Sequence, residues 1–142
     1  PEAADFVFTH QKNLTMVGLD VTLRTLLTKH ETAEWRHLNS EAGEKFASLM
    51  DFYIDAYYNL DIDKRGAALH DPLAVAVSID PTYITGLPLN MRVTYNTENG
   101  DYGRTIGDKT QLLAPTTSKA AVLVDTDRFV KDFQNMMLTV LK

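Results

Sequence analysis

An apolar run at residues 73–77, directly after the His-Asp-Pro triplet at 70–72, constrains the fold of this chain more than any other segment. Helices favour Asp at the N-cap and Pro at the first position, so the sequence predicts a helix that begins here with Asp71 as its cap. A helix that is apolar on every side must be buried. We therefore expect a buried helix whose start brings His70 and Asp71 to an interior cleft.

Two interpretations of this helix start fit the local pattern. An imidazole next to a carboxylate in a cleft suits a proton donor, which makes His70 a candidate for acid-base chemistry. In the simpler interpretation, Asp71 only caps the helix and His70 is a turn residue whose hydrogen bonds are satisfied.

The composition is that of a globular domain. Its 142 residues suffice for a substantial core, so we expect residues 1–142 to form a single domain or a fragment of one. The hydrophobic share is 44%, and because no apolar stretch approaches about 18 residues we expect no membrane span. A net charge of −5 with scattered basic residues argues against a nucleic-acid partner. The absence of cysteine excludes disulfides and thiolate chemistry, and without a recognisable leader we expect a cytoplasmic location.

The remaining pattern alternates between helices and strands. Apolar periodicity predicts helices at 2–8, 22–28 and 40–60, with Ser40 as a cap, and a last helix capped by Asp125 and Asp127. Apolar runs predict buried strands at 14–19 and 120–124, the first in a parallel sheet. Alternation at 89–95, an Asn-Gly dipeptide at 99–100 and residues 102–106 predict an antiparallel hairpin. This order of elements is typical of an α/β fold with mixed strand directions.

Two helices carry apolar faces that we expect in the core. On the helix at 40–60 the face consists of Phe46, Leu49, Met50, Tyr53, Ile54 and Tyr57. On the last helix, where we expect packing against the sheet, it consists of Phe129, Val130, Phe133, Met136, Met137, Val140 and Leu141. Tyr58 falls at the margin of the first face, where it either turns toward a ligand or remains a partly exposed residue at a helix end.

Five short segments occur in an order and spacing that point to one family. They are VGLDVT at 17–22, ALHDPLAVA at 68–76, IDP at 79–81, GRT at 103–105 and DTDRF at 125–129. Together they resemble the C-terminal half of an inosine-uridine preferring nucleoside hydrolase, and residues 69–76 are the most specific part. The resemblance implies the C-terminal portion of an open mixed-sheet α/β fold, with the hairpin near 89–106 and a C-terminal helix.

The same resemblance implies an activity and three site residues. Nucleoside hydrolases cleave the N-ribosidic bond of purine or pyrimidine nucleosides to ribose and free base, with calcium bound to the ribose hydroxyls and the attacking water. His70 would be the general acid that protonates the leaving base, and Asp71 would be one calcium ligand. Tyr58 would be a mobile substrate-binding residue that closes over the nucleobase.

The family's Asp-rich loop, which carries calcium and the catalytic base, is absent from these 142 residues. Because calcium takes about 6–8 oxygen ligands, we expect Asp71 to bind it only in a site completed elsewhere and not in this chain alone. We accordingly expect a fragment or processed piece whose partner is the missing N-terminal half. The strand at 14–19 would leave a sheet edge open, so we also expect a homo-oligomer or another covering molecule. The alternative function is a non-catalytic α/β module that binds ligands or self-associates without the calcium loop.

Overall fold

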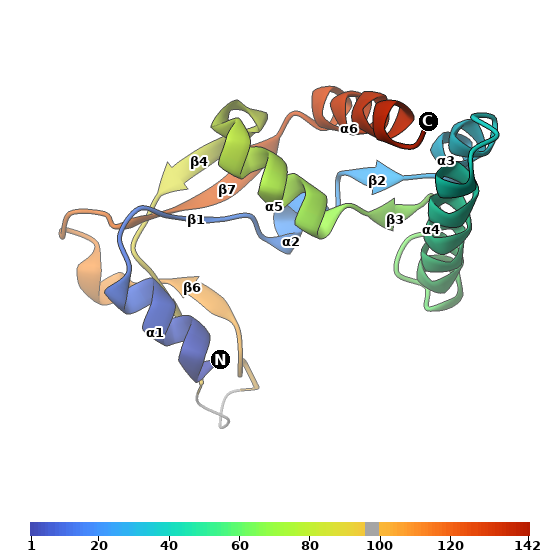
Figure 1. Cartoon of the computed structure of the whole chain (residues 1–142). Coiled ribbons are helices and arrows are strands. Elements are labelled where there is room, and N and C mark those ends of the chain that lie inside the picture. The colour runs from blue at the N-terminus through green and yellow to red at the C-terminus, as the bar shows by residue number, and fades with distance from the viewer. Residues whose placement is uncertain (96–99) are drawn as a thin grey trace. The chain divides into compact units, whose positions relative to one another are not determined.

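The computed structural model describes residues 1–95 and 100–142 and is drawn in Figure 1. These residues form two compact units. The first unit comprises Pro1–Gly18 and Thr85–Leu123, and the second comprises Leu19–Ile84 and Val124–Lys142. In the described ranges, no helix has the length and apolar character needed to cross a membrane.

The first unit contains a three-stranded sheet. Its strand order is β1 (Leu14–Met16), β7 (Ser118–Val124) and β4 (Ile84–Pro88). Strand β1 runs parallel to β7, with Leu14 opposite Ser118. This pairing confirms the predicted parallel strand, although β1 is shorter than residues 14–19. Among the described residues β1 is an edge strand, as expected.

A second, two-stranded sheet and one helix complete this unit. Strand β5 (Met91–Val93) pairs antiparallel with β6 (Thr105–Gly107), and the 3-10 helix η2 (Lys109–Gln111) follows. The helix α1 (Glu2–His10) packs along β5 (Figure 1).

A buried carboxylate fixes α1 against the hairpin. Asp5 accepts a 2.7 Å hydrogen bond from the backbone N–H of Val93, and its side chain is almost fully buried. The predicted first helix and the hairpin are therefore confirmed, with the return strand at 105–107 instead of 102–106. Asn99 of the predicted turn lies outside the described residues.

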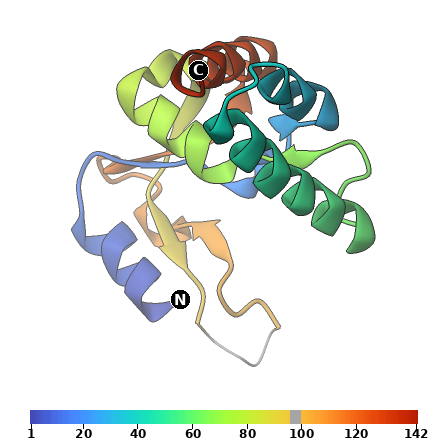
Figure 2. The same ribbon diagram turned by 45° about the vertical axis from the view of Figure 1, so that its right-hand side comes forward.

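The second unit consists mainly of helices. They are α2 (Leu19–Thr22), α3 (Lys29–Arg36), α4 (Glu41–Asn59), α5 (His70–Ile79), the 3-10 helix η1 (Pro81–Tyr83) and α6 (Thr126–Val140). Strands β2 (Leu26–Leu27) and β3 (Ala67–Ala68) form a two-stranded antiparallel sheet. Helices α3 and α4 run side by side, and α6 packs against α3 and α5 (Figures 1 and 2). The core contains the fully buried side chains of Trp35, Phe129, Leu27 and Leu73.

Two helices of this unit begin at a predicted cap, although Asp127, which we also expected to cap the last helix, lies inside its first turn. Ser40 Oγ accepts the backbone N–H of Gly43 at 2.9 Å where α4 begins, and the Asp125 carboxylate accepts the backbone N–H of Arg128 at 3.3 Å where α6 begins. The predicted helix at 22–28 is wrong. Residues 26 and 27 instead satisfy their backbone groups by pairing with β3, and Thr28 caps α3 in a capping box.

The apolar helix α5 is present, but two of its predicted details are wrong. It begins at His70, so Leu69 and not Asp71 occupies the N-cap position. Proline is tolerated within the first turn because the N–H groups there have no partner inside the helix. The helix is also buried on one face only, since Leu73 and Val77 are buried whereas Val75 and Ile79 are 60% and 80% exposed. Its main neighbours are α2, α6 and η1.

The buried face of α4 is rotated about the helix axis from the face that we predicted to lie in the core. Ile54 and Tyr57 are buried as expected, but Phe46, Leu49 and Tyr53 are exposed. The buried face instead includes two small residues, Gly43 and Ala47. A Cβ atom at Gly43 would overlap the carbonyl oxygen of Trp35 on α3. This close approach of the two helices sets which face of α4 is covered.

The predicted packing of α6 also needs correction. Its main neighbours are α3, α5 and η1 in its own unit, where we expected the sheet. Phe129 and the adjoining Leu141 are buried, but Met136 and Val140 are more than half exposed. One polar residue, Gln134, lies on the buried side of α6. Its side-chain oxygen accepts the indole N–H of Trp35 at 2.7 Å.

Candidate functional site

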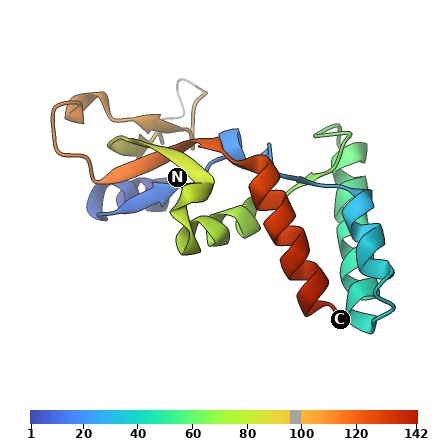
Figure 3. The ribbon, with the colours of Figure 1, turned by 90° about the horizontal axis from the view of Figure 1, so that it is seen from above.

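Strand β3 leads directly into α5, as the ribbon in Figure 3 shows. His70, whose imidazole is half-buried, is the first residue of this helix. Both of its ring nitrogens have hydrogen-bond partners. Nδ1 lies 2.7 Å from Oγ1 of Thr22 on α2, and Nε2 lies 2.7 Å from Oη of Tyr57 on α4. Three segments of the second unit therefore meet at this side chain.

A second tyrosine extends these contacts. The hydroxyl of Tyr53, one helical turn before Tyr57, donates to the Tyr57 hydroxyl at 3.2 Å, and the two rings meet edge to face with centroids 4.9 Å apart. Tyr57 is buried, whereas Tyr53 is 37% exposed. We call the connected groups of Thr22, His70, Tyr57 and Tyr53 the His70 chain; it runs from the interior to an accessible side chain.

The proton positions along the His70 chain follow from the state of Tyr57. Burial, assisted by the contact with Tyr53, raises the pKa of Tyr57 to about 12, so it is an uncharged phenol at neutral pH. Because Tyr57 accepts from Tyr53, its own proton is directed to Nε2 of His70. A neutral imidazole with its proton on Nδ1 would complete this arrangement by donating to Thr22, whose hydroxyl can either accept or donate.

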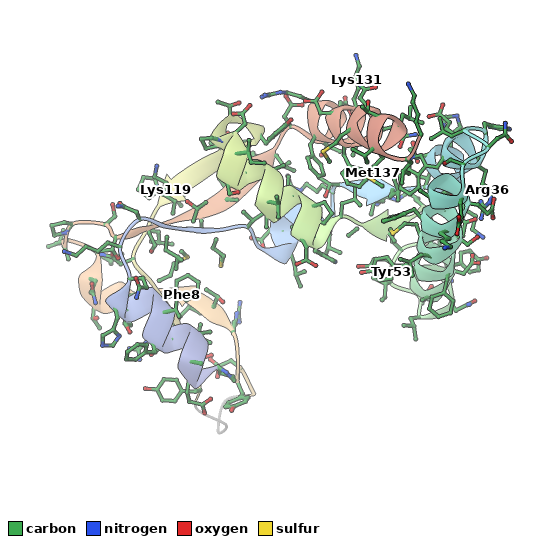
Figure 4. All side chains as sticks on the ribbon, in the orientation of Figure 1. Phe8, Arg36, Tyr53, Lys119, Lys131 and Met137 are labelled. Carbon is green, nitrogen blue, oxygen red and sulfur yellow. The ribbon has the colours of Figure 1, made fainter. Side chains whose placement is uncertain are left out.

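A cavity of about 390 Å³ opens beside His70. Its walls come from α3, α4, α6 and the start of α5, and they consist of Trp35, Phe46, Met50, Tyr53, Ala68, Leu69, His70, Asp71, Pro72, Phe133 and Met137. Figure 4 labels Tyr53 on α4 and Met137 on α6, which lie on two of these walls. Most lining groups are aromatic rings, aliphatic chains or thioethers, with His70, Asp71 and Tyr53 as polar exceptions. Such a cavity suits a flat organic group with few polar contacts.

Asp71 is an exposed carboxylate at the edge of this cavity. Calcium prefers about 6–8 oxygen ligands, and a carboxylate is a suitable one. However, the part of the chain that the structure describes contains no group of three or more His, Cys, Asp and Glu side chains able to hold a metal ion. Asp71 therefore fits calcium as a single ligand, and the described residues do not complete a site.

The structure does not bring Tyr58 to His70. Its ring is 54% exposed and carries the ammonium of Lys64 at 4.2 Å from the ring centroid. It lines a different pocket, together with Ile54 and charged side chains. The tyrosines at the site are Tyr57 and Tyr53, which we had assigned only to the core. The available signal was their separation of four residues, which places both hydroxyls on one helix face.

Comparison with known proteins gives consistent matches. The model of the family "Inosine-uridine preferring nucleoside hydrolase" matches residues 1–131. The pyrimidine-specific ribonucleoside hydrolase RihB of Shigella flexneri is 34% identical over 133 residues, which are 91% of this chain and 41% of that protein. RihB of Escherichia coli O17:K52:H18 is 32% identical over 130 residues, with the same coverage of 91% and 41%.

Solved structures of nucleoside hydrolases share the fold of this chain. The purine-preferring ribonucleoside hydrolase from Gardnerella vaginalis has a TM-score of 0.94 and 48% identity, and the match covers 100% of this chain and 45% of that one. A plant nucleoside hydrolase has a TM-score of 0.83 at 24% identity, with 98% and 45% covered, which supports the fold alone. The chain thus spans less than half the length of these relatives.

Proposed function

Because this chain belongs to the inosine-uridine preferring nucleoside hydrolase family, we propose that it supplies the proton-donating part of a site that hydrolyses the N-ribosidic bond of nucleosides. The products would be ribose and the free base. The observation that carries this proposal is the His70 chain, which ends at Tyr53 on the wall of the apolar cavity. We further propose that segments outside these 142 residues complete the site.

The leaving base needs a proton when its bond to ribose breaks, and the His70 chain is built to deliver one. When His70 is protonated, Nε2 donates to Tyr57 and the two phenol hydroxyls turn from their resting directions. Tyr57 then passes its own proton to Tyr53, and Tyr53 gives its proton to a nitrogen of the base. His70 loses one proton and the base gains one, while both phenols end uncharged. Thr22 Oγ1, 2.7 Å from Nδ1, would accept from it before and after the transfer.

The cavity walls favour a nucleobase as the group that leaves. The cavity is lined by Tyr53, at one end of the His70 chain, and also by the ring of Phe46 and the thioether of Met50. Together these side chains offer a contact surface for a flat ring. Tyr58 could close over the base only after it releases Lys64. Our proposal for base binding therefore centres on Tyr53, with Tyr58 as a contact of a rearranged state.

We also propose that Asp71 provides one carboxylate ligand to calcium in the complete enzyme. When bound, calcium would hold the ribose hydroxyls and the attacking water, as the family resemblance implies. The other ligands would come from outside this chain. No step of the proton transfer proposed above passes through the metal.

The test compares two leaving groups in the complete enzyme. His70→Ala should lower kcat by about 10²–10⁴-fold on inosine or uridine, whose bases need a proton to leave. Hydrolysis of a nitrophenyl riboside should be largely spared, because nitrophenolate leaves without a proton. Asp71→Ala should slow both substrates alike, and added calcium should partly restore them.

Equal losses on both substrates for His70→Ala would contradict the acid role and would indicate that His70 only holds the loop or the ribose. Calcium-independent loss for Asp71→Ala, at wild-type calcium affinity by titration calorimetry, would contradict the ligand role.

A further inference from the structure

The end of the His70 chain opposite to the cavity is a hydroxyl with no access to solvent. Thr22 is 2% exposed, and its Oγ1 lies 2.7 Å from Nδ1 of His70, although 48 residues separate the two in the sequence. A buried hydroxyl at this position does not touch the cavity. Its effect on any ligand there must pass through the imidazole.

The segment that carries Thr22 is tied to the residues around His70 by a second, independent bond. The backbone N–H of Leu69 donates to the carbonyl oxygen of Thr25 at 2.9 Å. The hydroxyl of Thr25 in turn donates to the carbonyl oxygen of Thr22 at 2.9 Å. Thr22 therefore sits in a short, braced turn, and its hydroxyl meets Nδ1 from a fixed direction.

We propose that Thr22 is a positioning residue for His70: its hydroxyl holds the neutral imidazole in the tautomer with the proton on Nδ1. This inference rests on the proposed function, because it assigns a purpose to the ring nitrogen that faces Tyr57. With the proton on Nδ1, the lone pair of Nε2 points to the phenol and is free to receive a proton after each transfer.

The alternative tautomer would work against the direction of the His70 chain. A neutral imidazole with its proton on Nε2 would present that proton to Tyr57 and leave Nδ1 as an acceptor toward Thr22. Tyr57 already accepts from Tyr53, so its own proton would lose its partner at Nε2. In the proposed arrangement the Thr22 hydroxyl accepts from Nδ1, and it can do so for both the neutral and the protonated ring.

Nitrogen NMR of the chain tests the assignment without any need for activity. Spectra are recorded at alkaline pH, where imidazole side chains are neutral. The His70 signals are identified by their loss in His70→Gln. We expect the proton-bearing nitrogen of wild-type His70 to be Nδ1, and Thr22→Val, which keeps the shape and removes the hydroxyl, to move the proton toward Nε2. A wild-type ring protonated on Nε2, or an unchanged spectrum of Thr22→Val, would overturn the proposal.

Two variants separate the hydroxyl of Thr22 from general packing. Thr22→Ser restores the hydroxyl in a smaller side chain and should keep the wild-type tautomer. Thr25→Val removes the hydroxyl that braces the same turn but keeps the bond from Leu69 to the Thr25 backbone, so any change at His70 should be smaller than in Thr22→Val. A tautomer change in Thr25→Val as large as that in Thr22→Val would show that packing alone, and not the Thr22 hydroxyl, sets the ring.

The last test measures kcat and KM of the Thr22 variants in the complete enzyme. Thr22→Val should lower kcat about tenfold with little change in KM, as expected for the loss of one buried hydrogen bond that orients an acid. Thr22→Ser should recover most of the loss. Full turnover by Thr22→Val would overturn the positioning role, whereas full turnover by His70→Ala would overturn the proposed function itself.

Discussion

The two ends of α5 are held by very different polar groups. At its start, the His70 chain is built from a hydroxyl, an imidazole and two phenols, and its central member Tyr57 is buried. Near its end, the guanidinium of Arg128 contacts the carboxylate of Asp80 and lies over the ring of Tyr83 at 4.3 Å.

The cluster at the end of the helix is charged and accessible. Tyr83 donates to Asp132 at 2.8 Å, and Arg128 donates to Thr82 at 2.8 Å, so η1 is fastened to α6 by ion pairs and hydrogen bonds. Exposed pairs of this kind are screened by water and contribute little each. The comparison teaches that one helix is anchored by charged groups at one end and by a hydroxyl, an imidazole and two phenols at the other.

The largest difference between the two ends of α5 is expected for Tyr57→Phe, which removes the central hydroxyl of the His70 chain. We expect kcat of the complete enzyme on inosine or uridine to fall about 10²-fold, because His70 loses its connection to Tyr53. Combined with His70→Ala, the loss should be much smaller than the sum of the two single losses, since both act on one proton path. Fully additive losses in a double-mutant cycle would contradict a shared path.

A smaller effect is expected at the accessible end of the His70 chain. Tyr53→Phe should lower kcat about tenfold, because water can partly replace a hydroxyl that is exposed. The matched control is Tyr83→Phe, which removes a hydroxyl at the opposite end of α5 and should leave turnover unchanged. If both variants lost the same activity, the two ends would not differ in function.

The smallest effect concerns the charged cluster and is a pH dependence of stability. Hydrogen bonds from the Thr82 hydroxyl and backbone, aided by the Arg128 guanidinium, lower the pKa of Asp80 below its ordinary 3.8. A lowered carboxyl pKa stabilises the fold above the ordinary value, and this stabilisation is lost as pH falls through the folded-state pKa. Asp80→Asn should thus lower the Tm slightly at neutral pH, and the difference should shrink as pH falls below about 3.8 and vanish once pH is below the lowered folded-state pKa. A difference that persists in acid would show that the charge of Asp80 is not its cause.

The sequence was sufficient for those features that depend on neighbouring residues. The caps at Ser40 and Asp125 were predicted because a capping side chain acts within three residues of its own position. The parallel pairing of β1 and the hairpin followed from short apolar patterns. The placement of His70 at a helix start beside a cavity belongs to this group as well.

Features that depend on distant residues were not predictable in the same way. The rotation of α4 follows from the approach of Gly43 to Trp35, and apolar periodicity does not report a contact between two backbones. The contact of Thr22 with His70 spans 48 residues, and that of Tyr57 spans 13. The family resemblance indicated His70 as a candidate acid, but the hydrogen-bond partners of its imidazole emerge only when three segments are brought together in space.

Trp35 gives the cavity an optical property. It is the only tryptophan in the sequence, it lines the cavity, and its indole N–H is held by Gln134. Its emission is therefore free of background from other indoles and originates from one wall of the space beside His70. A molecule that enters this space changes the surroundings of a single fluorophore, so the protein carries a built-in reporter of occupancy that needs neither label nor turnover.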